Sequence, residues 1–221
     1  MPDWTLHWLE AEGSLCPWQS QIAVEIEAAR QVIATVILSP RLDILIQRLS
    51  RGVIPEIGMV GHAYRKSLFS LTMDPDNAKF ERCLMDGTLR RQVAHEVHHC
   101  LRMAGPGYGR TLGEALVSEG LAGQFVTFLF KTPPEPWECA VDAEALNANM
   151  PDKTELASTE YDHGAWFYGL GDKRPRWLGY TLGYHIVGKW LQDVGDVGGD
   201  MWTNVSAEAV LSAAFERATQ T

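Results

Sequence analysis

The pentapeptide His95-Glu96-Val97-His98-His99 has the residue types and the spacing of a catalytic zinc site. Residues four apart lie on one face of a helix, so His95 and His99 can both bind one metal ion. Imidazole nitrogens bind Zn²⁺ at about 2.0–2.1 Å. Glu96 lies about 100° around the helix from His95, so it can instead take a proton from a water molecule beside the metal. We therefore predict zinc-dependent hydrolysis with Glu96 as the general base.

The residues around the motif predict that it lies on a helix over residues 88–104. Apolar residues recur at three- and four-residue spacing, namely Leu89, Val93, Val97, Cys100, Leu101 and Ala104. This stripe lies roughly opposite the two histidines, so one side of the helix should pack on a core and the other should face a cleft. Asp86 or Thr88 can cap its start, and Gly105-Pro106-Gly107 ends it. The alternative is a surface helix that carries a chance pair of histidines.

Catalytic zinc has three protein ligands, and Glu119 is the candidate for the third. It lies in the middle of the apolar face of a second predicted helix, over residues 111–130. A carboxylate on an apolar face is costly unless it is paired or bound to a metal ion. The alternative is a salt bridge to an arginine such as Arg102. We expect Glu114 to hydrogen-bond a ligand histidine instead of binding the metal.

Nineteen residues separate His99 from Glu119, which is the spacing of the gluzincin metallopeptidases, as in thermolysin-like enzymes. Three blocks resemble more narrowly a bacterial family known as predicted zinc-dependent proteases, a domain of unknown function. They are His95-Glu96-Val97-His98-His99, Ser118-Glu119-Gly120-Leu121-Ala122 and residues 179–187. The resemblance covers roughly residues 66–193. It implies an α+β zincin-like fold, a bound Zn²⁺ ion and hydrolysis of peptide bonds in a peptide or protein substrate.

Hydrolysis of this kind makes a negatively charged tetrahedral intermediate, which a phenol or imidazole donor near the zinc would stabilise. Tyr180, Tyr184 and His185 are the candidates, on a helix predicted over residues 175–192 with Pro175 in its first turn. The two tyrosines match the family block, whereas His185 stands where that block varies. The alternative for each is core packing. We prefer Tyr180, although the spacing does not separate it from Tyr184.

Two other functions are consistent with the same motif. The first is a different amide hydrolase, such as a deformylase. A deformylase needs a cysteine ligand in a Glu-Gly-Cys setting before the motif helix, and Cys83 lacks that setting. The second is a zinc-binding protein without turnover, with a regulatory or interaction role.

Length and composition limit the class of protein. The 221 residues, 46% of them hydrophobic, are sufficient for a single domain over residues 1–221 with a sizeable core. The net charge of −9 argues against nucleic acid or an anionic membrane as a partner. We expect no signal peptide, because the start lacks a basic region followed by an apolar run. No apolar stretch reaches the length of a membrane span, and the four cysteines show no paired spacing. We therefore expect a cytoplasmic protein with reduced thiols; the sequence indicates no oligomeric state.

The segments before the motif predict a small mixed or antiparallel sheet. We expect residues 1–16 to be irregular and to form a lid, followed by a helix over 19–38. Strands are predicted at 42–46, buried on both sides, at 57–63 and at 67–73. In zincin peptidases an antiparallel edge strand precedes the motif helix and binds extended peptides. Strand 67–73 has this position in the chain; the alternative is an ordinary covered strand.

The segments after the zinc helices are expected to complete the domain. We predict a helix over 137–149, a mixed polar segment over 151–174, a turn region over 193–202 and a last helix over 206–217. Glycines allow helices to approach closely. Gly120 and Gly123 should bring the second zinc helix near the motif helix. Gly179 and Gly183 are four residues apart and should permit close packing of the helix that carries them.

Overall fold

The computed structural model describes residues 4–216 of the chain. The chain divides into two compact units, residues 1–104 and residues 105–221. A small mixed sheet and many helices make up the described residues, so the predicted α+β class is confirmed. The single domain over residues 1–221 stays a prediction. Residues 1–3 of the expected lid, and Arg217 of the expected last helix, lie outside the described residues.

The first unit is built on a four-stranded sheet with the strand order β1-β2-β4-β3. The strands are β1 (Trp4–Leu9), β2 (Leu42–Arg48), β3 (Met59–Arg65) and β4 (Leu68–Met73). β1 and β4 both pair with β2 in parallel, whereas β3 pairs with β4 antiparallel. Among the described residues, the sheet therefore ends at β1 on one side and at β3 on the other.

The order of the strands corrects the expectation of an edge strand at 67–73. β4 is hydrogen-bonded to β2 on one side and to β3 on the other, and all but its first residue are buried. The alternative of a covered strand is right. The edge strand beside β4 is β3, and its residues His62, Tyr64 and Arg65 are exposed.

The expectation of an irregular N-terminal segment is wrong for Trp4–Leu9, which form β1, whereas residues 10–16 contain only turns and coil. In β1 the part-buried residues Trp4, Leu6 and Trp8 alternate with exposed ones. This period of two is that of a half-buried strand. The strand pairs with a segment far along the chain, for example Leu6 with Ile44, so its partner is not visible in the local sequence.

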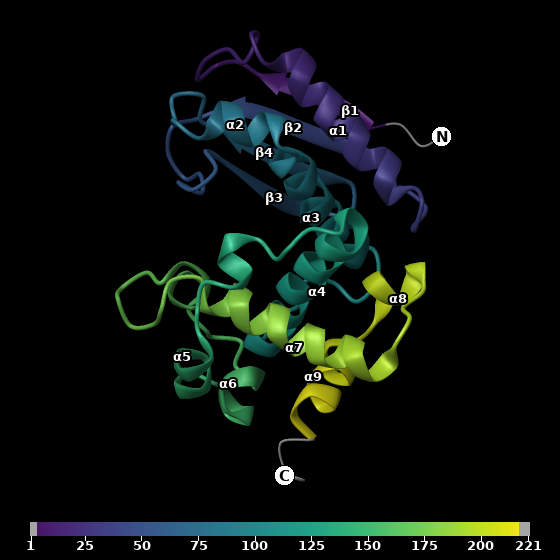
Figure 1. Ribbon diagram of the computed structural model, residues 1–221, viewed down its shortest axis with the longest axis vertical. Coiled ribbons are helices and arrows are strands. Elements are labelled where there is room, and N and C mark those ends of the chain that lie inside the picture. Colours follow the sequence, from purple (N-terminus) through teal and green to yellow (C-terminus); the bar gives the residue numbers. More distant parts are fainter. Residues whose placement is uncertain (1–3, 217–221) are drawn as a thin grey trace. The chain divides into compact units, whose positions relative to one another are not determined.

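The helices of the first unit cover one face of this sheet (Figure 1). They are α1 (Gln19–Ile33), α2 (Phe80–Met85) and α3 (Thr88–Met103). In β2 the buried residues Leu42, Ile44 and Ile46 alternate with the exposed Asp43 and the part-buried Leu45, so the prediction that this strand is buried on both sides is wrong. In β2, only the face that carries Leu42, Ile44 and Ile46 is fully buried.

Two helices of the first unit differ from the prediction in their extent. α1 ends at Ile33 and not at residue 38, because the chain turns there: both the N–H and the hydroxyl of Thr35 donate to the carbonyl of Val32, at 3.1 and 2.7 Å. α2 was not predicted, since six residues are too few to show a helical period. The motif helix α3 is confirmed with nearly the predicted ends.

The second unit is helical and is organised around α4 and α7. Its α-helices are α4 (Leu112–Phe130), α5 (Ala143–Ala148), α6 (Lys153–Ala157), α7 (Leu178–Val194), α8 (Gly199–Asn204) and α9 (Ala207–Glu216). Gly120 of α4 lies against the backbone of Gly183 in α7, and a Cβ on either would collide with the other helix. The close packing predicted for Gly183 is therefore confirmed. The prediction for Gly120 and Gly123 is wrong: Gly120 lies against Gly183 and Val187 of α7, and Gly123 lies against the side chains of Glu138 and Tyr184.

Three predicted segments of the second unit are shorter or differently placed. A 3₁₀ helix at Pro136–Glu138 and α5 replace the helix over 137–149, because the Asp142 side chain caps the N-H of Ala145 and starts a new helix. Pro175 lies before α7 and not in its first turn. The residue that precedes α7 is Trp177, in the left-handed region with φ of 67°. α8 (Gly199–Asn204) overlaps the end of the turn region expected over 193–202.

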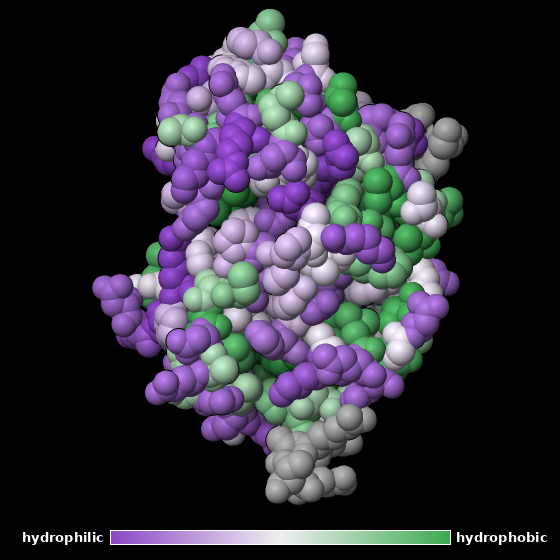
Figure 2. Space-filling model, in the orientation of Figure 1, coloured by the Kyte–Doolittle hydropathy of each residue, from purple (hydrophilic) through white to green (hydrophobic). Residues whose placement is uncertain are grey.

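No helix among residues 4–216 is both long and apolar enough to cross a membrane. On the face drawn in Figure 2, hydrophilic residues are interspersed with hydrophobic ones.

Candidate metal centre and active site

The two motif histidines converge on α3. The Nε2 atoms of His95 and His99 are 3.0 Å apart, and the rings stand at 81° to each other. Two nitrogens that each bind one tetrahedral ion at about 2.0–2.1 Å lie about 3.3 Å apart. The observed separation is close to this value, so the pair fits a zinc ion. His99 is buried and His95 is partly buried.

Glu96 is buried and lies directly over the edge strand β3. A Cβ at Gly61 of β3 would collide with the Cγ and Oε1 atoms of Glu96. The missing side chain at Gly61 thus creates the space in which the Glu96 carboxylate lies. The structure places Glu96 on a different side of α3 from the line that joins the two histidines, as the helical spacing predicts.

Three contacts fix the position of α3 in the first unit. At its start, Asp86 Oδ1 accepts a hydrogen bond from the N–H of Thr88 at 3.1 Å. On its side, Arg90 donates two bonds of 3.1 Å to the buried carboxylate of Glu25 in α1. Near its end, the Cys100 thiol lies 3.8 Å from the Leu68 carbonyl of β4. Burial, with a contribution from the Glu96 carboxylate, raises the pKa of Cys100 to about 12, so this thiol stays protonated and packs in the core.

Glu119 lies on α4, which begins with a capping box. The Thr111 side chain accepts from the N–H of Glu114, and the Glu114 carboxylate accepts from the N–H of Thr111. Glu119 is 8% exposed. Its Oε1 accepts a hydrogen bond of 2.7 Å from the hydroxyl of Tyr108, in the loop before α4. The neighbouring Ser118 hydroxyl donates to the Tyr108 carbonyl at 2.7 Å.

Further phenols of the second unit are grouped with Glu119. The hydroxyl of Tyr180 on α7 lies 3.3 Å from that of Tyr168, which ends a π-helical turn at Gly164–Tyr168. Burial raises the pKa of Tyr180 well above its usual value, and the Glu119 carboxylate raises it further. The same two causes, in the same order, raise the pKa of Tyr161. These phenols therefore keep their protons at neutral pH and can act as hydrogen-bond donors.

Tyr184 and His185 lie in other surroundings. The Tyr184 hydroxyl is 3.0 Å from Thr127 Oγ1 on α4. Burial raises the pKa of Tyr184, and the carboxylate that adds to the shift is that of Glu138, not that of Glu119. Burial, together with Lys189, lowers the pKa of His185. Of these candidates, Tyr180 is thus the one whose pKa the Glu119 carboxylate raises.

Two other histidines lie in packed surroundings. His98 is fully buried, since the face of α3 that carries it is packed. The ring of His163 stacks on Phe167 at 4.3 Å, and its Nδ1 lies 3.3 Å from the Tyr161 hydroxyl, so His163 belongs to the same aromatic group as the phenols.

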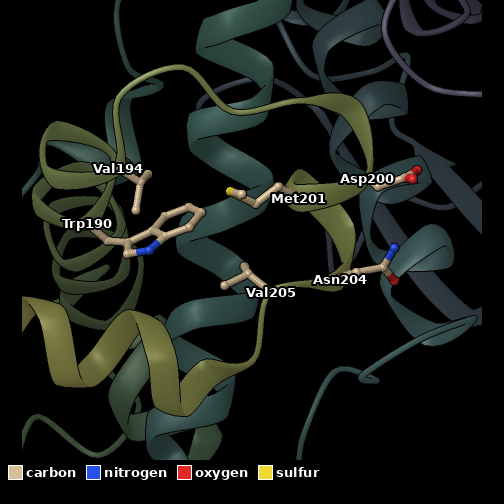
Figure 3. Close-up of a pocket in the computed structure, with 6 residues that line it drawn as sticks. All are labelled: Trp190, Val194, Asp200, Met201, Asn204 and Val205. Atoms are coloured by element: carbon tan, nitrogen blue, oxygen red, sulfur yellow. The ribbon is translucent and has the colours of Figure 1, made fainter.

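An open groove of about 510 Å³ lies elsewhere on the second unit, between α7 and α8 (Figure 3). It is lined by Trp190, Val194, Asp200, Met201, Asn204 and Val205. The indole of Trp190 faces Met201 and Val205, whereas Asp200 and Asn204 lie together at the far end. Trp190 follows Tyr180 by ten residues, about 15 Å along α7. The groove is therefore apolar and separate from the phenols around Glu119.

Comparison with known proteins gives one match. A family model, DUF2268, described as "Predicted Zn-dependent protease", matches residues 23–212. The chain belongs to this family, and the resemblance found in the three sequence blocks is confirmed. No curated protein and no solved structure matches the chain.

Sequence reasoning missed Tyr108 and Gly61. Tyr108 is an aromatic residue in a loop with several glycines, eleven residues before Glu119. A loop this short must keep its side chains near the first turns of α4, which is a signal that could have pointed to Tyr108. Gly61 carries no such signal, because its importance arises only when β3 packs under α3.

Proposed function

We propose that the protein is a zinc-dependent peptidase, in which His95 and His99 of α3 bind one Zn²⁺ ion together with Glu119 of α4. The convergence of the two histidine nitrogens at 3.0 Å carries this proposal. The family description, the gluzincin spacing and the burial of Glu119 support it. Each of the three residues offers one atom of a type that zinc prefers. The proposed fold type is that of the zincins.

A Zn²⁺ ion held by His95, His99 and Glu119 would supply a Lewis acid, which lowers the pKa of a bound water molecule and polarises a carbonyl group. Glu96 has the position of the general base. Its carboxylate takes a proton from the attacking water and then passes this proton to the leaving amine. Gly61 leaves room for these movements of the carboxylate, and burial of Glu96 keeps competing solvent away.

Tyr180 is the proposed donor to the oxyanion of the tetrahedral intermediate. Its phenol is protonated, lies with Glu119 and is hydrogen-bonded to Tyr168, which limits its rotation. A donor that is oriented before the reaction stabilises the developing charge without reorganisation. Tyr184, the other candidate, is engaged by Thr127.

The proposed substrate is an extended peptide or an unfolded segment of a protein. β3 is an edge strand, and the Glu96 side chain lies over its Gly61. A peptide can pair with an edge strand through main-chain hydrogen bonds, which do not depend on side-chain identity. β3 therefore takes the role that the sequence had suggested for strand 67–73.

The test combines metal analysis with a search for cleavage. Purified protein should contain close to one zinc per chain by elemental analysis, and His99→Ala should lose it. A mixture of unfolded peptides, analysed by mass spectrometry, identifies a peptide that the wild type cuts. Glu96→Gln should retain zinc and peptide binding but cut this peptide about 10²–10⁴-fold more slowly.

Three results would each contradict part of the proposal. Full zinc retention in His99→Ala would exclude the ligand assignment. Equal cleavage by Glu96→Gln would exclude this residue as the base. Zinc binding without cleavage of any peptide, in a library that includes folded and unfolded proteins, would favour the alternative of a zinc protein without turnover.

A further inference from the structure

We propose that Tyr108 is a positioning residue, which holds the Glu119 carboxylate in the orientation that binds the metal. This inference rests on the proposed zinc site. Its phenol donates to Glu119 Oε1 at 2.7 Å, a length typical of a hydrogen bond to a charged acceptor. Because one carboxylate oxygen is held, rotation of the carboxylate about its last side-chain bond is restricted.

Tyr108 is itself held at a second point. The Ser118 hydroxyl donates to its backbone carbonyl at 2.7 Å, and Ser118 is fully buried. Ser118 and Glu119 are adjacent in α4, so one helix binds the same loop residue through its main chain and through its side chain. The hydrogen bond from Ser118 holds the backbone of Tyr108 against α4. The hydrogen bond from the Tyr108 phenol then holds the carboxylate of Glu119.

The other phenols of the group have different partners. The Tyr161 hydroxyl lies 3.3 Å from His163, and the Tyr168 hydroxyl lies 3.3 Å from that of Tyr180. Neither of these contacts restrains Glu119. Tyr161→Phe is therefore a matched control for Tyr108→Phe: each variant removes one phenol oxygen from the same aromatic group, and only one of them removes the restraint.

The expected result is a change in metal binding with the fold retained. Removing an outer partner of a metal ligand typically weakens metal binding about 10–100-fold. We expect this loss of zinc affinity in Tyr108→Phe, measured by competition with a chromophoric chelator, and near-wild-type affinity in Tyr161→Phe. The visible absorption spectrum of the Co²⁺-substituted protein reports ligand geometry and should change in Tyr108→Phe alone.

Ser118→Ala provides a second and independent measurement. If Ser118 acts through Tyr108, its removal weakens zinc binding in the wild type but has little further effect in Tyr108→Phe. Coupling of this kind appears as non-additivity in a double-mutant cycle. A purely structural role of Ser118 would instead give the same loss in both backgrounds.

The outcomes separate this inference from the proposed function. Zinc binding by the wild type and its loss in Glu119→Ala test the metal site itself. If both hold but Tyr108→Phe has wild-type affinity and a wild-type Co²⁺ spectrum, the positioning role is overturned and the metal site stands. Additive effects of Ser118→Ala and Tyr108→Phe would overturn the part of the inference in which Ser118 acts through Tyr108. If the wild type binds no zinc, both proposals are wrong.

Discussion

The proposed general base, Glu96, packs closely against the strand beneath it. Glu96 lies where a side chain at Gly61 would be, so the identity of residue 61 sets the position of the carboxylate. The carboxylate must reach the attacking water within hydrogen-bond distance to act as a base. A glycine on a strand is therefore as much a part of the proposed site as the residues that carry the chemistry.

We predict that Gly61→Ala retains zinc but cuts peptides at least about 10²-fold more slowly, because the new methyl group displaces the Glu96 carboxylate. Overpacking of this kind also costs about 1–3 kcal/mol of stability. Zinc content, cleavage rate and denaturation midpoint check these effects. Gly198→Ala is the matched control, since no atom lies within 4 Å of a Cβ built there. Wild-type cleavage by Gly61→Ala would show that Glu96 has more freedom than the structure indicates.

The two tyrosines of α7 are predicted to differ. Tyr180→Phe should lower kcat by about 10²-fold or more with little change in substrate binding, because it removes a donor that acts on the transition state. Tyr184→Phe removes a hydroxyl that contacts Thr127 and should leave kcat nearly unchanged. Steady-state kinetics on one identified peptide separates kcat from KM. If Tyr180→Phe and Tyr184→Phe both have a near-normal kcat, neither tyrosine acts as the donor, and the role of α7 is packing alone.

At the scale of elements, α1 and α3 are joined by the ion pair of Glu25 and Arg90. Glu25 is 4% exposed, and Arg90 reaches it with two bonds from a partly exposed position. Without Arg90, the buried Glu25 carboxylate would lose its charged partner and keep only the 3.3 Å hydrogen bond from the Gln21 side chain, which is costly. The pair therefore contributes to holding the motif helix on the sheet.

We predict that Arg90→Met lowers the free energy of unfolding by about 2–3 kcal/mol, measured by urea denaturation. Arg82→Met is the control. Arg82 lies 3.6 Å from Asp86 with its side chain 84% exposed, and such surface pairs contribute about 0–1 kcal/mol. Equal losses in the two variants would show that burial of Glu25 does not matter for stability.

The elements that the sequence predicted well are those whose signal is local. α3 and α4 have a helical apolar period and residues that start and stop a helix, and their ends were predicted to within a residue or two. The strand order was not predictable in this way. Pairing of β1 with β2, and of β4 with β2, joins segments separated by a helix or a hairpin, and parallel pairing leaves no turn signature.

The candidate site shows the same division. His95, Glu96 and His99 could be predicted from the sequence because about one helical turn brings them together. Glu119 could be predicted because a carboxylate on an apolar helix face is unusual. Which α7 tyrosine lies with Glu119 depends on the rotation of α7 against α4, which Gly120 and Gly183 determine. That contact is a property of two helices, and the α7 sequence alone does not contain it.

At the scale of the whole molecule, this acidic chain buries several thiols and phenols, which become negatively charged only at high pH. The net charge is −9 at pH 7. Burial is the largest cause that raises the pKa of Cys83, Cys100, Tyr180 and Tyr184. The folded state therefore keeps protons that the unfolded state releases as the pH rises. The stability that these groups contribute is present in full below their unfolded pKa values and is lost above them.

Cys100 gives this dependence a magnitude. Its pKa is 9.0 without burial and about 12 in the folded protein, so raising the pH from 8 to 11 should remove about 2–3 kcal/mol of stability through this thiol alone. Cys100→Ala lacks the titrating group, and its loss of stability over the same pH range should be smaller than that of the wild type by this amount. Cys16→Ala removes an exposed thiol and should follow the wild type. Denaturant unfolding at pH 8 and pH 11 measures the difference. Identical pH dependence in Cys100→Ala and wild type would mean that water reaches the thiol beneath α3, which would also weaken the case for a shielded Glu96.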